Sequence, residues 1–119
     1  MRETSKTITY KGKEYKIVFN LNVAEAIQAE YGTLDKWGEL TDGGEAGEVD
    51  IKALIFGCRE MLNEGIEISN DDNGTNEPLL THKQVGRLIT EVGLGSVTET
   101  VNDLVVDSTN NEAENSKNA

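Results

Sequence analysis

The fold of this chain is decided by residues 15–37, YKIVFNLNVAEAIQAEYGTLDKW. The stretch opens with apolar residues at every second position, the alternation typical of a half-buried β-strand. It passes through Asn22, a good N-cap, into a helical pattern that ends at Gly32. A second, shorter helical pattern follows at once. The stretch therefore predicts a junction between a strand and two helices, and we expect the rest of the domain to pack around it.

Upstream of this junction, residues 6–11 (KTITYK) alternate polar and apolar side chains and predict a first strand. Residues 11–14 (KGKE) supply a turn, with Gly12 available for a positive φ. The sequence therefore predicts a β-hairpin over residues 6–19. A lone hairpin is marginally stable in water, so its apolar face must rest on the helices that follow.

Downstream, apolar residues recur at helical spacing over residues 23–31, 34–40, 51–64 and 82–92, and again after Ser96. Gly65 is expected to end the third helix, with an edge strand at residues 66–68. Capping boxes are predicted at THKQ, which begins at Thr81, and at SVTE, which begins at Ser96. The expected fold class is mainly α with an N-terminal β-hairpin (α+β), a small bundle of about four to five short helices.

Length and composition predict one domain over residues 1–106, since 119 residues suit a single core of modest size. Residues 107–119 (DSTNNEAENSKNA) hold no large apolar side chain, and they predict a disordered acidic and polar tail. The net charge is −11, distributed as +3 over residues 1–20 and −14 over the remainder. This balance favours solubility and disfavours direct binding to nucleic acid. A more specific interpretation of the acidic charge is that the chain binds a basic partner or a basic segment of one.

Residue types that carry chemistry are sparse, and they indicate neither an enzyme nor a metal or cofactor site. Cys58 falls on the apolar stripe of its helix, which favours a buried structural thiol and, as a lone cysteine, a reducing compartment. His82 has no Cys or His at ligand spacing. The glycine-rich loop at 41–49 is acidic and lacks a phosphate-binding pattern. With no apolar leader or membrane-spanning run, a soluble intracellular protein is expected.

With these residues placed, the chain resembles the tail assembly chaperones of long-tailed bacteriophages of Gram-positive hosts. The resemblance rests on the hairpin TITYKGKEYKIVFNLNV running into AEAIQAEYGTLDKW. In the family, a K-x-Y-x-L-x-F strand leads into a short helix ending in Gly, and a small S/T-L-D helix follows. Here these are residues 15–22, 26–32 and 33–35. A further amphipathic helix and a T-x-x-x-x-x-x-L-I helix fit residues 51–92.

The resemblance implies a chaperone that binds the tape measure protein and keeps it soluble during tail-tube assembly. It implies a location in the host cytoplasm, absence from the mature virion, and contact with tail-tube protein through a frameshifted longer form. A homo-oligomer is also expected, with neither nucleic acid nor membrane as a partner. The partner would lie in an apolar groove, for which the candidate residues are Ile27, Tyr31, Trp37, Ile55, Met61 and Leu62. Of these, Tyr31 and Trp37 are expected to be partly exposed.

Two alternatives stay open at the level of sequence. The charge of −14 beyond residue 20 is compatible with an acidic DNA mimic or inhibitor, although the acids form no regular array along one helix face. A structural phage component, such as a head–tail connector or tail terminator, is the other alternative. Detection of the chain in purified virions would favour the structural component over the chaperone.

Overall fold

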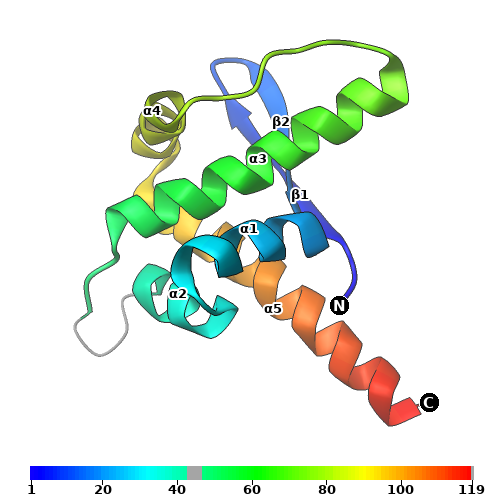
Figure 1. Cartoon of the computed structure of the whole chain (residues 1–119). Coiled ribbons are helices and arrows are strands. Elements are labelled where there is room, and N and C mark those ends of the chain that lie inside the picture. Colours follow the sequence, from blue (N-terminus) through cyan, green and yellow to red (C-terminus); the bar gives the residue numbers. More distant parts are fainter. Residues whose placement is uncertain (43–46, 119) are drawn as a thin grey trace.

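The computed structural model describes residues 1–42 and 47–118, with side chains placed through residue 109. The described residues form a small α+β domain of two strands and five helices (Figure 1). The predicted fold class is therefore confirmed. Residues 43–46 of the predicted glycine-rich loop, and residue 119, lie outside the described part.

The hairpin consists of β1 (Thr4–Tyr10) and β2 (Lys13–Phe19), paired antiparallel with Tyr10 opposite Lys13. Lys11 and Gly12 form the two-residue turn, and both have positive φ, 51° and 74°. Such a turn matches the right-handed twist of the flanking strands. The predicted hairpin is confirmed, with its first strand beginning two residues earlier than the sequence pattern indicated.

Two short helices follow directly, α1 (Leu21–Tyr31) and α2 (Leu34–Thr41). The α1 cap is Asn20 rather than the predicted Asn22, because the Asn20 side chain accepts hydrogen bonds from the backbone of Asn22 and Val23. Thr33 caps α2 as predicted, accepting from the Lys36 backbone N–H at 3.0 Å. The junction at Gly32, with φ at 92°, therefore lies where the sequence places it.

The central element is α3 (Ile51–Asn73), which lies across β2 (Figure 1). It does not end at Gly65 as predicted, and residues 66–68 are helical rather than an edge strand. A Cβ atom on Gly65 would overlap the backbone carbonyl of Lys16, so this glycine lets the helix approach the strand closely. The helix ends instead at Gly74, whose left-handed φ of 65° is typical of a C-cap.

The connection from α3 to α4 (His82–Val92) is held by two asparagines. Asn63 donates to the Leu80 carbonyl at 3.1 Å and accepts from its N–H at 2.8 Å. Asn70 accepts from the backbone N–H of Glu77 and donates to the Glu77 carbonyl, both at 3.0 Å. The predicted capping box at Thr81 is confirmed: the Thr81 hydroxyl accepts from the Gln84 backbone N–H, and the Thr81 N–H donates to the Gln84 side chain. These bonds fix where α4 lies beside α3.

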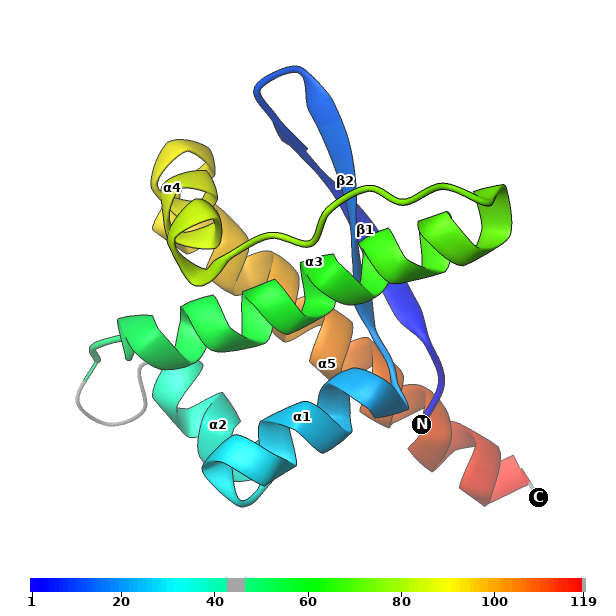
Figure 2. The same cartoon turned by 45° about the horizontal axis from the view of Figure 1, so that its top comes forward.

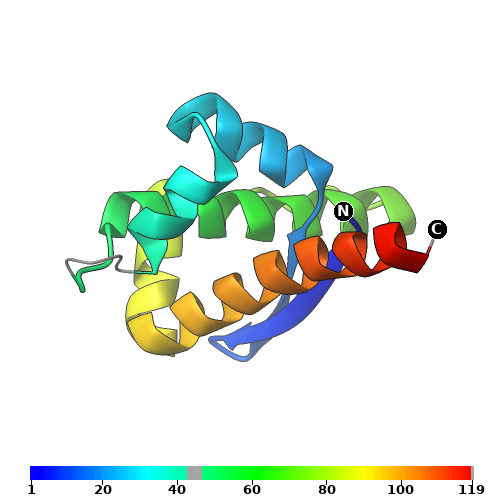
Figure 3. The ribbon, with the colours of Figure 1, turned by 90° about the horizontal axis from the view of Figure 1, so that it is seen from below.

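The last helix, α5 (Leu94–Asn118), runs along β1 (Figure 3). It begins before Ser96, so the capping box predicted there is absent. It also continues through the segment predicted to be a disordered tail. Ser108 is fully buried and donates to the Arg2 carbonyl at 2.7 Å, which shows that the domain does not end at residue 106. Thr4 and Lys6 of β1 also bond to α5, at Leu104 and Asp103.

The core is built from side chains of all five helices, together with Ile8 of β1 and the C-terminal half of β2. The largest fully buried side chains include Trp37, Phe19, Ile17, Leu54 and Leu88. Val18, on the opposite face of β2 from Ile17 and Phe19, is also fully buried, so both faces of the hairpin are covered at this end. The turn of the hairpin, in contrast, projects beyond α3 on the side where α4 lies (Figure 2).

Candidate functional site

The six residues predicted to line a partner groove do not lie on one surface. Four of them, Ile27, Trp37, Met61 and Leu62, are at most 1% exposed and belong to the core. The prediction of a groove lined by these four is therefore wrong for the folded domain. Only Tyr31 and Ile55 are partly exposed, and of these two only Ile55 lines the groove described below.

Because Trp37 is amphipathic, the sequence predicts it at an interface. In the structure its one polar side-chain group, the indole N–H, has a hydrogen-bond partner inside the domain. The indole N–H donates to the Ala53 carbonyl of α3 at 2.9 Å. The ring rests against Gly57, where a Cβ atom would overlap it. A buried Trp needs such a partner for its N–H, and here the backbone of α3 provides one.

Tyr31 packs edge-on against Phe56, with ring centroids 5.5 Å apart. The guanidinium carbon of Arg59 lies over the Phe56 ring, 5.9 Å from its centroid. Desolvation, with the carboxylates of Asp50 and Glu30 nearby, raises the pKa of Tyr31 above its ordinary value. The predicted partial exposure of Tyr31 is confirmed. Its ring joins a small aromatic contact between α1 and α3 rather than a groove.

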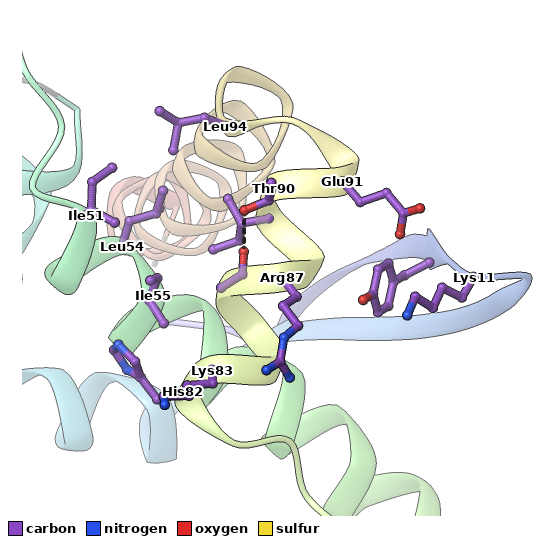
Figure 4. Close-up of a pocket in the computed structure, with 13 residues that line it drawn as sticks. Lys11, Ile51, Leu54, Ile55, His82, Lys83, Arg87, Thr90, Glu91 and Leu94 are labelled. Atoms are coloured by element: carbon purple, nitrogen blue, oxygen red, sulfur yellow. Dashed lines mark hydrogen bonds between the residues drawn. The ribbon is translucent and has the colours of Figure 1, made fainter.

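An open groove of about 1030 Å³ runs along α4 (Figure 4). On one side of α4 lies the N-terminal part of α3, with Ile51, Leu54 and Ile55. On the other side lies the hairpin turn, with Tyr10 and Lys11. The remaining lining residues come from α4 and the start of α5: His82, Lys83, Gly86, Arg87, Ile89, Thr90, Glu91 and Leu94. We call this surface the α4 groove.

The apolar part of the α4 groove is partly open to solvent. Ile51 is 50% exposed and Leu94 is 43% exposed, and both are among the few large apolar residues on the surface. Gly86 in the middle of α4 carries no side chain, and the Thr90 hydroxyl already donates to the Gly86 carbonyl at 2.8 Å. Large apolar side chains exposed along one groove favour burial by a partner.

The charged part of the groove has a sign opposite to that of the chain. Lys11, Lys83 and Arg87 line it, against one acid, Glu91. Lys83 and Arg87 form no ion pair with any residue that the structure describes. Lys11 instead lies over the Tyr10 ring, with its ammonium 5.4 Å from the centroid. The rim of the groove is thus locally basic, although the protein as a whole has a net charge of −11.

Sequence reasoning missed this site for an identifiable reason. Lys83 and Arg87 stand at i and i+4 on one helix, a spacing that places both on one face, and this signal was available. Ile51, however, falls on the apolar stripe of residues 51–64 and Leu94 lies between two predicted helices, and nothing local brings them together across the groove. Their proximity depends on the placement of α4 by Asn63 and Asn70.

The described residues form no candidate metal site. No group of three or more His, Cys, Asp or Glu side chains there could hold a metal ion. Cys58 is buried, and desolvation raises the pKa of its thiol to about 12. Among the described helices, none is both long and apolar enough to cross a membrane.

Comparisons with protein-family models, curated proteins and solved structures found no match for the chain.

Proposed function

We propose that the chain is a phage tail assembly chaperone that binds helical segments of the tape measure protein and keeps them soluble during tail-tube assembly. The observation that carries the proposal is the α4 groove, an open apolar surface alongside a helix, of the kind that receives an amphipathic helix. The resemblance of residues 15–37 to the chaperone family supports it. The α+β fold, with its N-terminal hairpin leading into short helices, is compatible with that resemblance.

The chaperone would act in the host cytoplasm and be absent from the mature virion. A tape measure protein exposes long apolar helix faces that aggregate unless they are covered. The many surface acids of the chaperone would keep a client carrying several copies in solution. The C-terminal end of α5 is where a frameshifted extension that recruits tail-tube protein would attach.

The proposal expects a long, mainly helical protein to be encoded beside this gene, and the absence of such a reading frame would argue against it. The direct test is coexpression of the chain with that protein. The chaperone is expected to raise the soluble fraction of that client and to be recovered with it in a pull-down. A pull-down of the intact client that recovers none of the chain would contradict the proposal. Presence of the chain in purified virions would favour a structural phage component instead.

Matched variants locate the contact on the chaperone. Ile51→Asp with Leu94→Asp places two charges in the apolar part of the α4 groove and is expected to abolish recovery of the client. Leu21→Asp with Leu79→Asp is the control, since these residues are 70% and 46% exposed and do not line the groove. All four positions are exposed, so the fold should tolerate each change. Equal loss in both double variants would contradict binding in the groove.

A further inference from the structure

We infer that the occupant of the α4 groove is an amphipathic helix with acidic residues along one flank. This inference rests on the proposed function for the nature of the client and specifies which of its segments bind here. It reverses the expectation from composition, in which an acidic chaperone selects basic stretches. Local charge decides this preference, because a partner that docks in a groove meets the rim of the groove rather than the average surface.

The groove has two unlike sides. Figure 4 shows Ile51, Leu54 and Ile55 on the α3 side of α4, and Lys11 with Arg87 on the side of the hairpin. A helix that lays its apolar face against the α3 side would turn one polar flank toward Lys83, Arg87 and Lys11. Carboxylates on that flank would meet cations that have no ion-pair partner among the described residues.

The net charge of −11 does not reverse this preference at physiological ionic strength. Exposed charges farther apart than about 8 Å are largely screened at 0.15 M salt. Charges at the rim contact the occupant directly and dominate the choice between acidic and basic flanks. Glu91, one turn beyond Arg87, is the only acid lining the groove, so the acidic residues of the occupant should lie at the Lys83 end.

The size of the groove fits a short helix. The neighbouring α4 has 11 residues, which corresponds to roughly 16 Å of helix at 1.5 Å per residue. A helix of about 14 residues, with apolar residues at i, i+3, i+4 and i+7, would span this length. Burial of Ile51 and Leu94 would supply most of the binding free energy. The charges of the rim would set the specificity among helices that share the same apolar face.

The test uses the full chain and two synthetic helical peptides of about 14 residues that differ only in one flank, with Glu in one and Lys in the other. Binding is measured by titration at about 0.15 M salt, and the contact is mapped by backbone amide NMR. The Glu-flanked peptide is expected to bind about tenfold tighter, since two or three rim pairs are gained or reversed. Amide shifts are expected at Ile55, Gly86 and Leu94.

The decisive variant is Lys83→Glu with Arg87→Glu, which should invert the preference so that the Lys-flanked peptide binds more tightly. The control is Lys16→Glu with Lys36→Glu, two exposed cations outside the groove that give the same change in net charge. The control should keep the preference for the Glu-flanked peptide. Inversion in both variants would show a global charge effect and overturn the inference.

The remaining outcomes separate the inference from the proposed function. Equal affinity for both peptides, or binding of neither, overturns the inference even if the tape measure protein is recovered. Tight binding of the Glu-flanked peptide with no recovery of the tape measure protein overturns the proposed function and keeps the inference. Amide shifts in the groove that depend on chain concentration alone would assign it to a second copy, and would also overturn the inference.

Discussion

The indole ring of Trp37 lies in the space that a Cβ atom on Gly57 would occupy. This contact joins α2 to α3, and the bond from the indole N–H to Ala53 fixes the ring in place. Gly57 is therefore present in the interior of a helix for packing, although glycine weakens a helix relative to alanine. The relationship explains why an aromatic residue expected at a surface is 1% exposed.

Gly57→Ala is expected to destabilise the domain by about 1–3 kcal/mol, the usual cost of overpacking a core. The ring cannot move aside cheaply, because it is buried and its N–H is bonded to α3. Denaturant unfolding monitored by the fluorescence of Trp37, the only tryptophan, measures the change. Unchanged stability together with unchanged emission would show that the ring does not rest on Gly57.

Gly86→Ala is the matched substitution in a helix with room for a methyl group. A Cβ atom there meets only the Ile55 side chain at 3.6 Å, an ordinary van der Waals distance. The helix propensity of alanine should then raise the free energy of unfolding by about 0.5–1 kcal/mol. The same unfolding measurement checks this, and a loss of stability would mean that α4 and α3 lie closer than described.

Ser96→Ala tests where α5 begins. If Ser96 were the N-cap that its sequence motif indicates, its removal would cost about 1 kcal/mol. In the structure the helix begins at Leu94 and Ser96 is exposed within its first turn, so the expected change is close to zero. Thermal unfolding of the variant beside the parent chain distinguishes these two results.

Ser108→Ala tests the end of the domain. Its buried hydroxyl donates to the Arg2 carbonyl, and loss of that bond should cost about 1 kcal/mol. Amide hydrogen exchange should also become faster at the start of β1, because the bond ties the N-terminus to α5. A disordered segment at residues 107–119 would instead make this variant neutral by both measurements.

Cys58 is expected to resist alkylation by iodoacetamide at pH 8 in the folded protein and to react after unfolding. Desolvation raises its pKa from 9.0 to about 12, so little thiolate forms and access is blocked. The ionised thiol favours the unfolded chain. Its contribution to stability is therefore complete below pH 9 and is lost as pH rises toward 12. Cys58→Ala should remove this part of the alkaline loss of stability.

Local sequence signals predict the hairpin, the junction at Gly32, α2 and α4, because turn residues and caps act within a few positions of each other. Lys11 and Gly12 set the turn, Thr33 caps α2, and Thr81 with Gln84 begins α4. These are local hydrogen bonds and backbone preferences, which a single sequence displays directly. The α+β class follows from them together with the apolar periodicity.

The length of α3, the burial of Trp37 and the α4 groove depend on contacts between segments far apart in the sequence. Gly65 reads locally as a helix end, yet it lies in the helix interior because the Lys16 backbone approaches it from β2. Trp37 packs into the core against Gly57, and the distant Ala53 carbonyl accepts the N–H that burial removes from water. The groove unites Lys11, Ile51 and Arg87 from three separate segments. Long-range packing sets these contacts, and no local pattern encodes them.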